Sequence, residues 1–422
     1  MTSEINETAS PSVKITAQCL CKAHTFSTAI PADRLPLRAS YCHCNSCRHL
    51  TGALYTCSAL WPGPSADIES NTTLKRYKFT DHVTVLFCGT CSSPMFAREV
   101  EKDARGEVSY GVCTGILSGT VNDGKEENVK NLVRIAHHMF LGDTLDGGAS
   151  CWMRRPNGRD GDAAKRWLGQ RAESKEIKED KEWPDLEELP SAEWKTDEKE
   201  KEVSIRCHCG GVDLTLHVAV LQMQFAATAQ KGEEELPWFV DPKTFKSIGT
   251  FDGCDSCRLS AGVDIFNWTF MLLQHISFPK SDGQDNGREF PRDSNELKAV
   301  VEERDKEGSG SWDPRLGTLT FFASSPDVQR YFCSRCSACV FYAWDGRPQM
   351  VDVAVGVLHA ASGARAEGII SWSLGGGTSY REDMVGTWRE ELVKAVEKEA
   401  DEWRVRRGYP KNWRRVLKEG GA

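Results

Sequence analysis

Three cysteines lie close together in the segment YCHCNSCRHLTG (41–52), at Cys42, Cys44 and Cys47, and Arg48 follows the last of them. Thiolates bind zinc, and a zinc ion with three protein ligands leaves a fourth position for water or substrate. Three thiolates suit a soft sulfur partner better than strong activation of water. We therefore predict an open zinc site suited to a soft sulfur ligand.

Two alternatives compete with the open site. A fourth ligand from Cys57, His43 or His49 would close it, and a disulfide-bonded loop would need no metal. Three further side chains are candidate catalytic groups. His43 and His49 are candidate proton carriers, and Arg48 offsets the negative charge, grips a substrate carboxylate or only binds backbone carbonyls.

A separate set of cysteines has the pattern of a closed zinc site. Cys19 and Cys21 form a CxC pair, which in a strand points both thiols to the same side, and Cys88 and Cys91 form a CxxC pair typical of a tight turn. Four thiolates complete a tetrahedral structural site. Because the pairs are far apart in sequence, such a metal would tie the start of a domain to its end.

The order CxC, CxxCRxxxG, FCxxC occurs twice, which predicts a tandem duplication. In the second occurrence, the cysteines of these motifs are Cys207, Cys209, Cys254, Cys257, Cys333 and Cys336. We expect the first and last pairs of this set to form another structural zinc site. Asp252 stands opposite Cys42, so only Cys254 and Cys257 remain as candidate thiolate ligands of a second open site. The first copy is therefore predicted to carry the activity and the second to be degenerate.

The elements around these motifs are predicted to be mainly strands. HVTVLFC, VSYGVC, LTLHVAV, TLTFFA and MVDVAVGVL are short and rich in β-branched residues, and a convincing helix appears only over 381–408. Residues 171–202 carry thirteen acidic and seven basic side chains, a composition typical of a solvated linker. The predicted units are a first zinc domain at 13–155, a linker at 156–202, a second domain at 203–375 and a helical segment at 380–420.

The composition of the chain limits the partners and the cellular compartment that we expect for this protein. The 422 residues carry a formal net charge of −8, so no nucleic-acid or membrane partner is expected. No apolar segment is long enough to span a bilayer, and the N-terminus does not resemble a signal peptide. We therefore expect a cytoplasmic protein, with the nucleus as the alternative, whose cysteines are thiols or metal ligands rather than disulfides. The cysteines outside the motifs, predicted to pack as small apolar side chains, are Cys57, Cys113, Cys151 and Cys339.

The ordered set CxC, CxCxxCRxxxG, CxxC resembles the family of the glutathione-dependent formaldehyde-activating enzyme, which also includes centromere protein V. The resemblance implies two tandem β-tent domains, each a two-layer β-sheet structure around a four-cysteine zinc, and a further zinc on Cys42, Cys44 and Cys47. Two zinc ions are thus expected in the first domain and at least one in the second. Ser92 and Ser337 depart from the family pattern, which usually has glycine there.

The same resemblance implies the function. Family members are assigned carbon–sulfur lyase chemistry, with glutathione as the thiol and formaldehyde as the carbonyl partner. A small thiol conjugate or an aldehyde is therefore the expected partner of this chain, and the oligomeric state stays open. The alternative is a non-catalytic binding module stabilised by zinc, the role implied by the centromere-protein side of the family.

Overall fold

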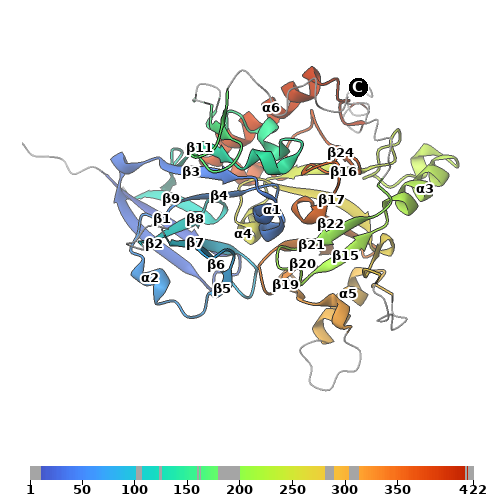
Figure 1. Ribbon diagram of the computed structural model, residues 1–422, viewed down its shortest axis with the longest axis horizontal. Coiled ribbons are helices and arrows are strands. Elements are labelled where there is room, and N and C mark those ends of the chain that lie inside the picture. Colours follow the sequence, from blue (N-terminus) through green and yellow to red (C-terminus); the bar gives the residue numbers. More distant parts are fainter. Residues whose placement is uncertain are drawn as a thin grey trace, which may run out of the picture.

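Strands dominate the computed structural model, which describes residues 11–100, 107–122, 126–158, 161, 163–178, 200–280, 289–303, 313–413 and 416. We call residues 11–178 the first half and residues 200–379 the second half. The two halves lie side by side, and a long C-terminal helix covers one edge of both (Figure 1). The mainly β prediction and the C-terminal helix are confirmed.

The first half contains two sheets. The smaller has the strand order β10 (Glu126–Asn128), β9 (Leu117–Asn122), β1 (Ser12–Gln18) and β2 (Thr25–Pro31). The larger has the order β13 (Glu176–Ile177), β12 (Lys165–Trp167), β11 (Val133–Met139), β3 (Leu37–Cys42), β4 (Thr56–Leu60), β8 (Val108–Cys113), β7 (Pro94–Val100), β6 (Val83–Phe87) and β5 (Lys75–Lys78). Strands β3 and β11 run parallel and the neighbours from β3 to β5 are antiparallel.

The second half also contains two sheets. The smaller has the order β18 (Ile276–Ser277), β15 (Asp213–Leu216), β14 (Val203–Arg206) and β23 (Leu358–His359). The larger has the order β19 (Leu319–Ser325), β20 (Val328–Cys333), β21 (Cys339–Trp344), β22 (Met350–Ala354), β17 (Phe266–Leu272), β16 (Ser247–Asp252) and β24 (Ile370–Trp372). The order from β19 to β24 repeats the order from β5 to β11, down to the parallel pair at the end.

Helices are short except at the C-terminus. The α-helices are α1 (Asn45–Thr51), α2 (Ala66–Glu69), α3 (Val218–Ala229), α4 (Asp255–Ala261), α5 (Ser294–Glu303) and α6 (Arg389–Arg406). The 3-10 turns are η1 (Ala32–Arg34), η2 (Thr114–Ile116), η3 (Leu141–Thr144), η4 (Gly148–Trp152), η5 (Glu233–Glu235), η6 (Leu273–His275), η7 (Pro314–Leu316), η8 (Val355–Val357) and η9 (Arg381–Met384). Helices α1 and α4 begin inside the two CxxCR motifs, directly after the first cysteine, and each ends at a left-handed glycine, Gly52 or Gly262.

The structure corrects one detail of the predicted elements. LTLHVAV was predicted as one strand, but only β15 is extended and α3 begins at Val218, because the alternation of LTLHV does not continue into LQMQFAATA. The predicted linker 156–202 lies partly outside the described residues. Its described N-terminal part contains β12 and β13, which extend the large sheet of the first half.

The two halves meet through a pair of matching contacts. The amide of Gly115 in η2 donates to the carbonyl of Gly262 at 3.1 Å, and the amide of Gly356 in η8 donates to the carbonyl of Gly52 at 2.8 Å. Each motif helix thus ends against a 3-10 turn of the other half, as in the self-complementary interface of a symmetric dimer. Both helices lie near the middle of the molecule (Figure 1).

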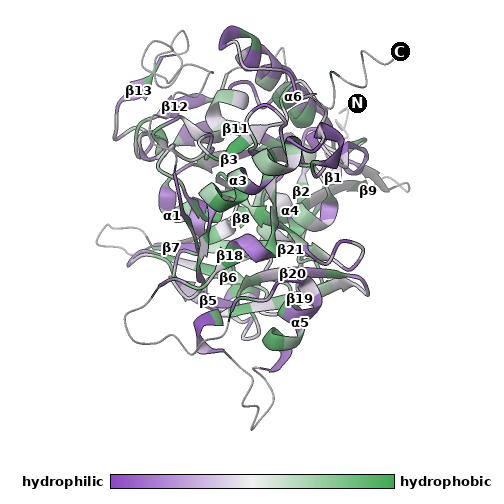
Figure 2. Ribbon diagram, turned by 90° about the vertical axis from the view of Figure 1, so that its right-hand side faces the viewer, coloured by the Kyte–Doolittle hydropathy of each residue, from purple (hydrophilic) through white to green (hydrophobic). Residues whose placement is uncertain are grey.

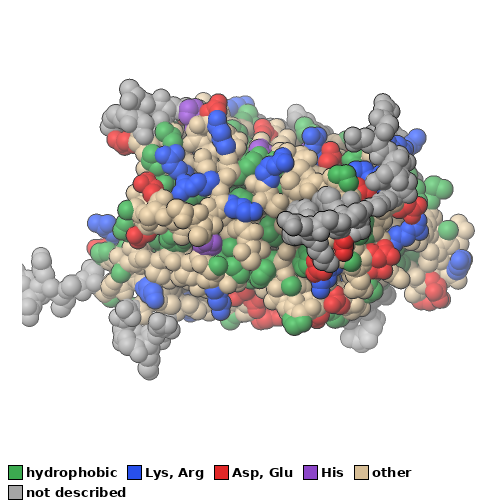
Figure 3. Space-filling model, turned by 90° about the horizontal axis from the view of Figure 1, so that it is seen from below, with side chains coloured by type: hydrophobic (Ala, Val, Ile, Leu, Met, Phe, Trp, Pro, Cys, Tyr) green, Lys and Arg blue, Asp and Glu red, His purple; other side chains and the backbone are tan. Residues whose placement is uncertain are grey.

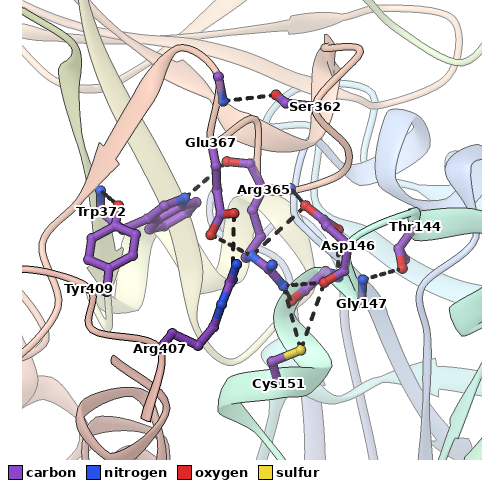
Figure 4. A network of polar contacts seen from close by, with 12 residues as sticks. Thr144, Asp146, Gly147, Cys151, Ser362, Arg365, Glu367, Trp372, Arg407 and Tyr409 are labelled. Carbon is purple, nitrogen blue, oxygen red and sulfur yellow. Dashed lines mark hydrogen bonds and ion pairs between the residues drawn. The ribbon is translucent and has the colours of Figure 1, made fainter. Parts of the chain in front are cut away.

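Buried ion pairs fasten the C-terminal part to both halves. Arg389 at the start of α6 donates to Asp264 at 2.8 Å and to the carbonyls of Thr114 at 2.6 Å and Leu117 at 2.9 Å. A second network surrounds the fully buried Arg365 (Figure 4). Its guanidinium lies 3.0 Å from the carboxylate of Glu367 and donates to the sulfur of Cys151, to the carbonyl of Asp146 and to the carbonyl of Gly148. Removing one partner of such a network lowers the stability of the fold, because the remaining charge is buried without a partner.

The hydropathy of the residues differs between the centre and the outside of the molecule. Central strands such as β8 are hydrophobic, whereas the outer turns of α6 are hydrophilic (Figure 2). Basic and acidic side chains are interspersed on the face shown in Figure 3.

Close packing between the halves makes Gly52 sensitive to substitution. Its φ is +78°, and an added Cβ would overlap the carbonyl oxygen of Cys339. We expect Gly52→Ala to lower the free energy of unfolding by about 2–5 kcal/mol, since the left-handed backbone and overpacking both contribute. Gly386 is the matched control, because its φ is +76° but its Cβ would meet open space. Gly386→Ala should cost only about 1–2 kcal/mol in the same denaturant titration, and equal costs would contradict tight packing at Gly52.

Candidate metal centres and active site

Two four-cysteine clusters have the spacing of closed metal sites. In the first half, the sulfur of Cys21 lies 3.6 Å from Cys19 and 3.5 Å from Cys88, and Cys91 completes the group. In the second half, Cys209 lies 3.6 Å from Cys207 and 3.5 Å from Cys333, and Cys336 completes the group. These separations are too long for disulfides and close to the edge of about 3.8 Å in a tetrahedron with zinc–sulfur bonds of about 2.3 Å.

The turns that carry these clusters explain two unusual residues. Ser92 and Ser337 follow the second cysteine of each CxxC pair, with φ of +65° and +68°. Both are therefore left-handed, the conformation that glycine adopts most easily. The backbone keeps the shape expected for glycine although the side chain has changed.

The three cysteines of the opening motif converge where β3 ends and α1 begins. The sulfurs of Cys42 and Cys44 are 3.6 Å apart, and all three sulfurs lie within 4.8 Å of one another. Cys44 accepts a hydrogen bond from the amide of Cys47 at 3.3 Å. Hydrogen bonds from Cys42 and Cys47 lower the pKa of the Cys44 thiol to about 3. Cys42 and Cys44 are half-buried and Cys47 is buried, so the cluster is partly exposed.

Among the described residues, no fourth ligand joins this cluster. Cys57 pairs with Tyr41 across β3 and β4, so it points to the sheet face opposite Cys42. The ring of His43 contacts His138 at 2.9 Å. His49 contacts the carbonyl of Gly356 at 2.7 Å. The three residues that could have supplied a fourth ligand therefore point away from the cluster or make other contacts. This arrangement favours an open site.

Both histidines of the motif are buried. His43 is fully buried and His49 is 8% exposed. Burial lowers the pKa of each ring to about 3, so both are neutral at physiological pH. His49 also stacks on His359 of the second half, with ring centroids 3.9 Å apart.

Arg48 is a buried cation beside the cluster. It is 5% exposed, and one terminal nitrogen donates to Asn45 at 2.5 Å. Its Nε and its other terminal nitrogen have no hydrogen-bond partner within the described part of the chain. Burial lowers the pKa of its guanidinium, while the negative charges of Asp146, Cys44 and Asp143 oppose that shift. Two buried donors beside the sulfurs are thus left for an external acceptor.

The equivalent arginine of the second half shows why these donors are unused. Arg258 donates to the carbonyl of Gly115 and to Asp255. The carbonyl equivalent to Gly115 is Gly356, which His49 contacts instead. Leu259 occupies the place of His49 in the second motif and cannot make this contact. The histidine therefore takes the carbonyl that would otherwise bind Arg48.

The second motif forms a different cluster. The carboxylate of Asp252 accepts from the amide of Cys254 at 2.7 Å and from the thiol of Cys257 at 3.6 Å. Burial raises the pKa of Asp252 to about 7, and a hydrogen bond from Cys257 lowers the pKa of Cys254 to about 6. These ligand atoms also lie within 4.8 Å of one another.

One residue of this cluster was not predicted from the sequence. Arg330 on β20 donates to the sulfur of Cys257 at 3.4 Å. Its counterpart in the first half is Val85, because each lies three residues before the first cysteine of the FCxxC motif. Extending the comparison of LFCGTC with YFCSRC by one residue toward the N-terminus would have revealed this difference.

The remaining cysteines lie outside all four clusters. Three of them, Cys57, Cys151 and Cys339, are buried, and Cys113 is half-buried. Burial raises the pKa of the thiols of Cys57, Cys113 and Cys339. The environment of Cys57, Cys113 and Cys339 agrees with the predicted packing role, whereas the sulfur of Cys151 accepts a hydrogen bond from Arg365.

Comparison with known proteins found one match, which is to a family model. The family model described as glutathione-dependent formaldehyde-activating enzyme matches residues 14–134, a segment that contains all seven clustered cysteines of the first half. No curated protein and no solved structure matched the chain. Within the described residues, none of the helices is long and apolar enough to cross a membrane. Residues 14–134 are thus similar to the family of the glutathione-dependent formaldehyde-activating enzyme.

Proposed function

We propose that the protein is a zinc-dependent carbon–sulfur lyase that acts on an adduct of a thiol and an aldehyde at Cys42, Cys44 and Cys47. Glutathione and formaldehyde are the proposed thiol and aldehyde, because the matching family is described by them. The observation that carries the proposal is the juxtaposition of three converging sulfurs without a fourth described ligand and two unpartnered donors of Arg48.

The proposed zinc would be held by Cys42, Cys44 and Cys47 and would supply a soft Lewis-acid centre for sulfur or carbonyl oxygen. In the direction of addition, the thiolate of the substrate attacks the carbonyl carbon. The carbon–sulfur bond forms, and the oxygen takes a proton from solvent. Cleavage is the reverse, in which the adduct's hydroxyl loses its proton and the carbon–sulfur bond breaks.

The protein's own groups bind and orient this substrate. Arg48 offers two N–H donors, which suit a carboxylate or the developing oxyanion. His43 is neutral and fully enclosed, so we assign it to positioning Cys42 and Cys44 through its contact with His138 rather than to proton transfer with solvent. His49 positions Arg48 by taking the carbonyl of Gly356.

The proposed organisation follows from the repeated strand order and motifs. We propose that the halves are tandem β-tent domains, that each four-cysteine cluster holds a structural zinc, and that the first half alone carries the activity. In this proposal, the second half stabilises the active first half through the contacts between the two halves. The purified chain should contain about three zinc ions, two structural and one catalytic.

The direct test is an assay of adduct formation and breakdown. The protein is mixed with glutathione and formaldehyde, and the S-hydroxymethyl adduct is followed by NMR exchange spectroscopy against the uncatalysed rate. Acceleration that disappears when zinc is removed with a chelator and returns with added zinc is the expected result. A rate equal to the uncatalysed one in the zinc-loaded protein would refute lyase activity on this pair of substrates.

Arg48 provides a more specific test of substrate binding. We expect Arg48→Gln to raise KM for the adduct about 10- to 100-fold, because a charge-assisted hydrogen bond contributes roughly 1.5–3 kcal/mol. Steady-state kinetics measure this change. Arg258→Gln is the matched control at the same motif position and should leave KM unchanged, since Arg258 binds Gly115 and Asp255. Equal effects of both variants would contradict a role of Arg48 in binding substrate.

A further inference from the structure

The second-half cluster has a buried guanidinium, that of Arg330, at a position where the first half has the uncharged Val85. Arg330 is 6% exposed, and its Nη1 donates to the sulfur of Cys257 at 3.4 Å. The guanidinium also lies over the ring of Tyr342, 5.1 Å from its centroid, and its Nε donates to Ser324. The equivalent residue of the first half, Val85, is buried and carries no charge.

This cation changes what the cluster can hold. A guanidinium that donates to a sulfur satisfies a thiolate directly, as a metal otherwise would. It also repels a dication bound to the same sulfur. The cluster has in addition lost one thiolate, because Asp252 replaces the counterpart of Cys42. Although the spacing of the ligand atoms would admit a metal, the charges around Cys257 therefore fit a zinc site poorly.

The two thiols of the cluster differ in their access to solvent. Cys254 is half-buried, whereas Cys257 is 4% exposed and lies between Arg330 and Asp252. An accessible thiol followed three residues later by a buried one, with both sulfurs within 4.8 Å, is an arrangement that permits exchange with an external disulfide.

We propose that Cys254 and Cys257 form a metal-free redox pair that exchanges with low-molecular-weight disulfides, and that Arg330 takes the place of the metal. The pair is a site of its own, and the proposal does not depend on the lyase activity of the first half.

The proposed exchange has two steps. The thiolate of Cys254 attacks one sulfur of the disulfide RSSR, which forms a mixed disulfide and releases one RS⁻. Cys257 then transfers its proton to Asp252, which accepts from it at 3.6 Å. The resulting thiolate, stabilised by Arg330, attacks the sulfur of Cys254 and releases the second RS⁻. The two cysteines are oxidised to a disulfide and RSSR is reduced to two thiols.

Oxidised glutathione is the probe for a direct test on the full zinc-loaded chain. After incubation, free thiols are alkylated and each cysteine is mapped by peptide mass spectrometry, with released zinc measured in parallel. We expect a disulfide between Cys254 and Cys257 and no zinc release. Cys257→Ser should instead accumulate a glutathione mixed disulfide on Cys254. In Arg330→Val, the disulfide should form about tenfold more slowly.

Metal content tests the other part of the proposal. Cys254→Ser should contain as much zinc as the unmodified chain. The double variant Asp252→Cys with Arg330→Val restores the residue set of the first half and should gain about one zinc per chain. Loss of one zinc in Cys254→Ser would overturn the proposal, as would fully alkylated Cys254 and Cys257 after treatment with excess oxidised glutathione. Neither result would affect the assay of the first half, so failure of this proposal is distinguishable from failure of the lyase.

Discussion

Cys44→Ser is expected to remove adduct formation almost entirely, by more than about 100-fold in kcat/KM, which exceeds the usual cost of losing a residue that only orients a metal ligand. The reason is that Cys44 belongs to the three-sulfur cluster and is the thiol whose pKa is lowered to about 3 by its two neighbours. A serine oxygen is a harder donor and a poorer zinc ligand. The variant should also contain about one zinc ion less than the unmodified chain, measured by elemental analysis.

Cys254→Ser is the matched control, because Cys254 holds the same motif position in the second half. It should retain full lyase activity. Both variants should unfold at similar temperatures, since neither residue belongs to a four-cysteine cluster. Activity that survives the combined loss of Cys42, Cys44 and Cys47 would end the assignment of this cluster as the active centre.

Cys333→Ser is expected to have the largest effect on stability. Cys333 is completely buried and contacts the sulfur of Cys209 at 3.5 Å within the second-half cluster. Binding of structural zinc is worth about 10–16 kcal/mol in small zinc domains, as much as the whole stability of a typical domain at about 5–15 kcal/mol. We therefore expect the variant to lose one zinc and to unfold below physiological temperature.

We expect unfolding of the second half to lower the activity of the first half, which is the half that we propose to be active. His208 lies between two cysteines of the second-half cluster, and its amide donates to the carbonyl of His49 at 2.9 Å. Thermal unfolding followed by near-ultraviolet circular dichroism, together with zinc content and lyase activity, measures the effect. Cys113→Ser, outside all clusters, serves as the control and should cost only about 1 kcal/mol. A first half that keeps full activity after the second half has unfolded would contradict this coupling.

Local parts of the fold could be predicted from the sequence. β-branched alternation identified β6, β8, β19 and β22, and the four-residue apolar spacing identified α6. The start of α3 was missed because Val218 and Val220 continue the β-branched composition of the preceding strand. The contacts between the halves could not be predicted at all. They depend on backbone carbonyls such as those of Gly52 and Gly262, whose placement requires the whole tertiary structure.

The cysteine clusters were predictable for a related reason. Ligand spacing within CxC and CxxC is set by local backbone geometry, so Cys19, Cys21, Cys88 and Cys91 could be grouped before their strands were placed. The availability of Arg48 was not predictable, because it depends on the competition of His49 for a carbonyl some 300 residues away. Arg330 was not identified from the sequence for another reason: it lies outside the cysteine motifs.

The matching contacts of Gly115 with Gly262 and of Gly356 with Gly52 have a consequence for how such a protein can change over generations. In a dimer of two identical chains, one codon specifies both sides of the contact, so every substitution appears twice. Here each side has its own codon. One motif can therefore carry Asp252 where the other carries Cys42, while the contacts between the halves remain matched. When both sides lie in one chain, the ligand residues of one motif can change without any change in the backbone contacts between the halves.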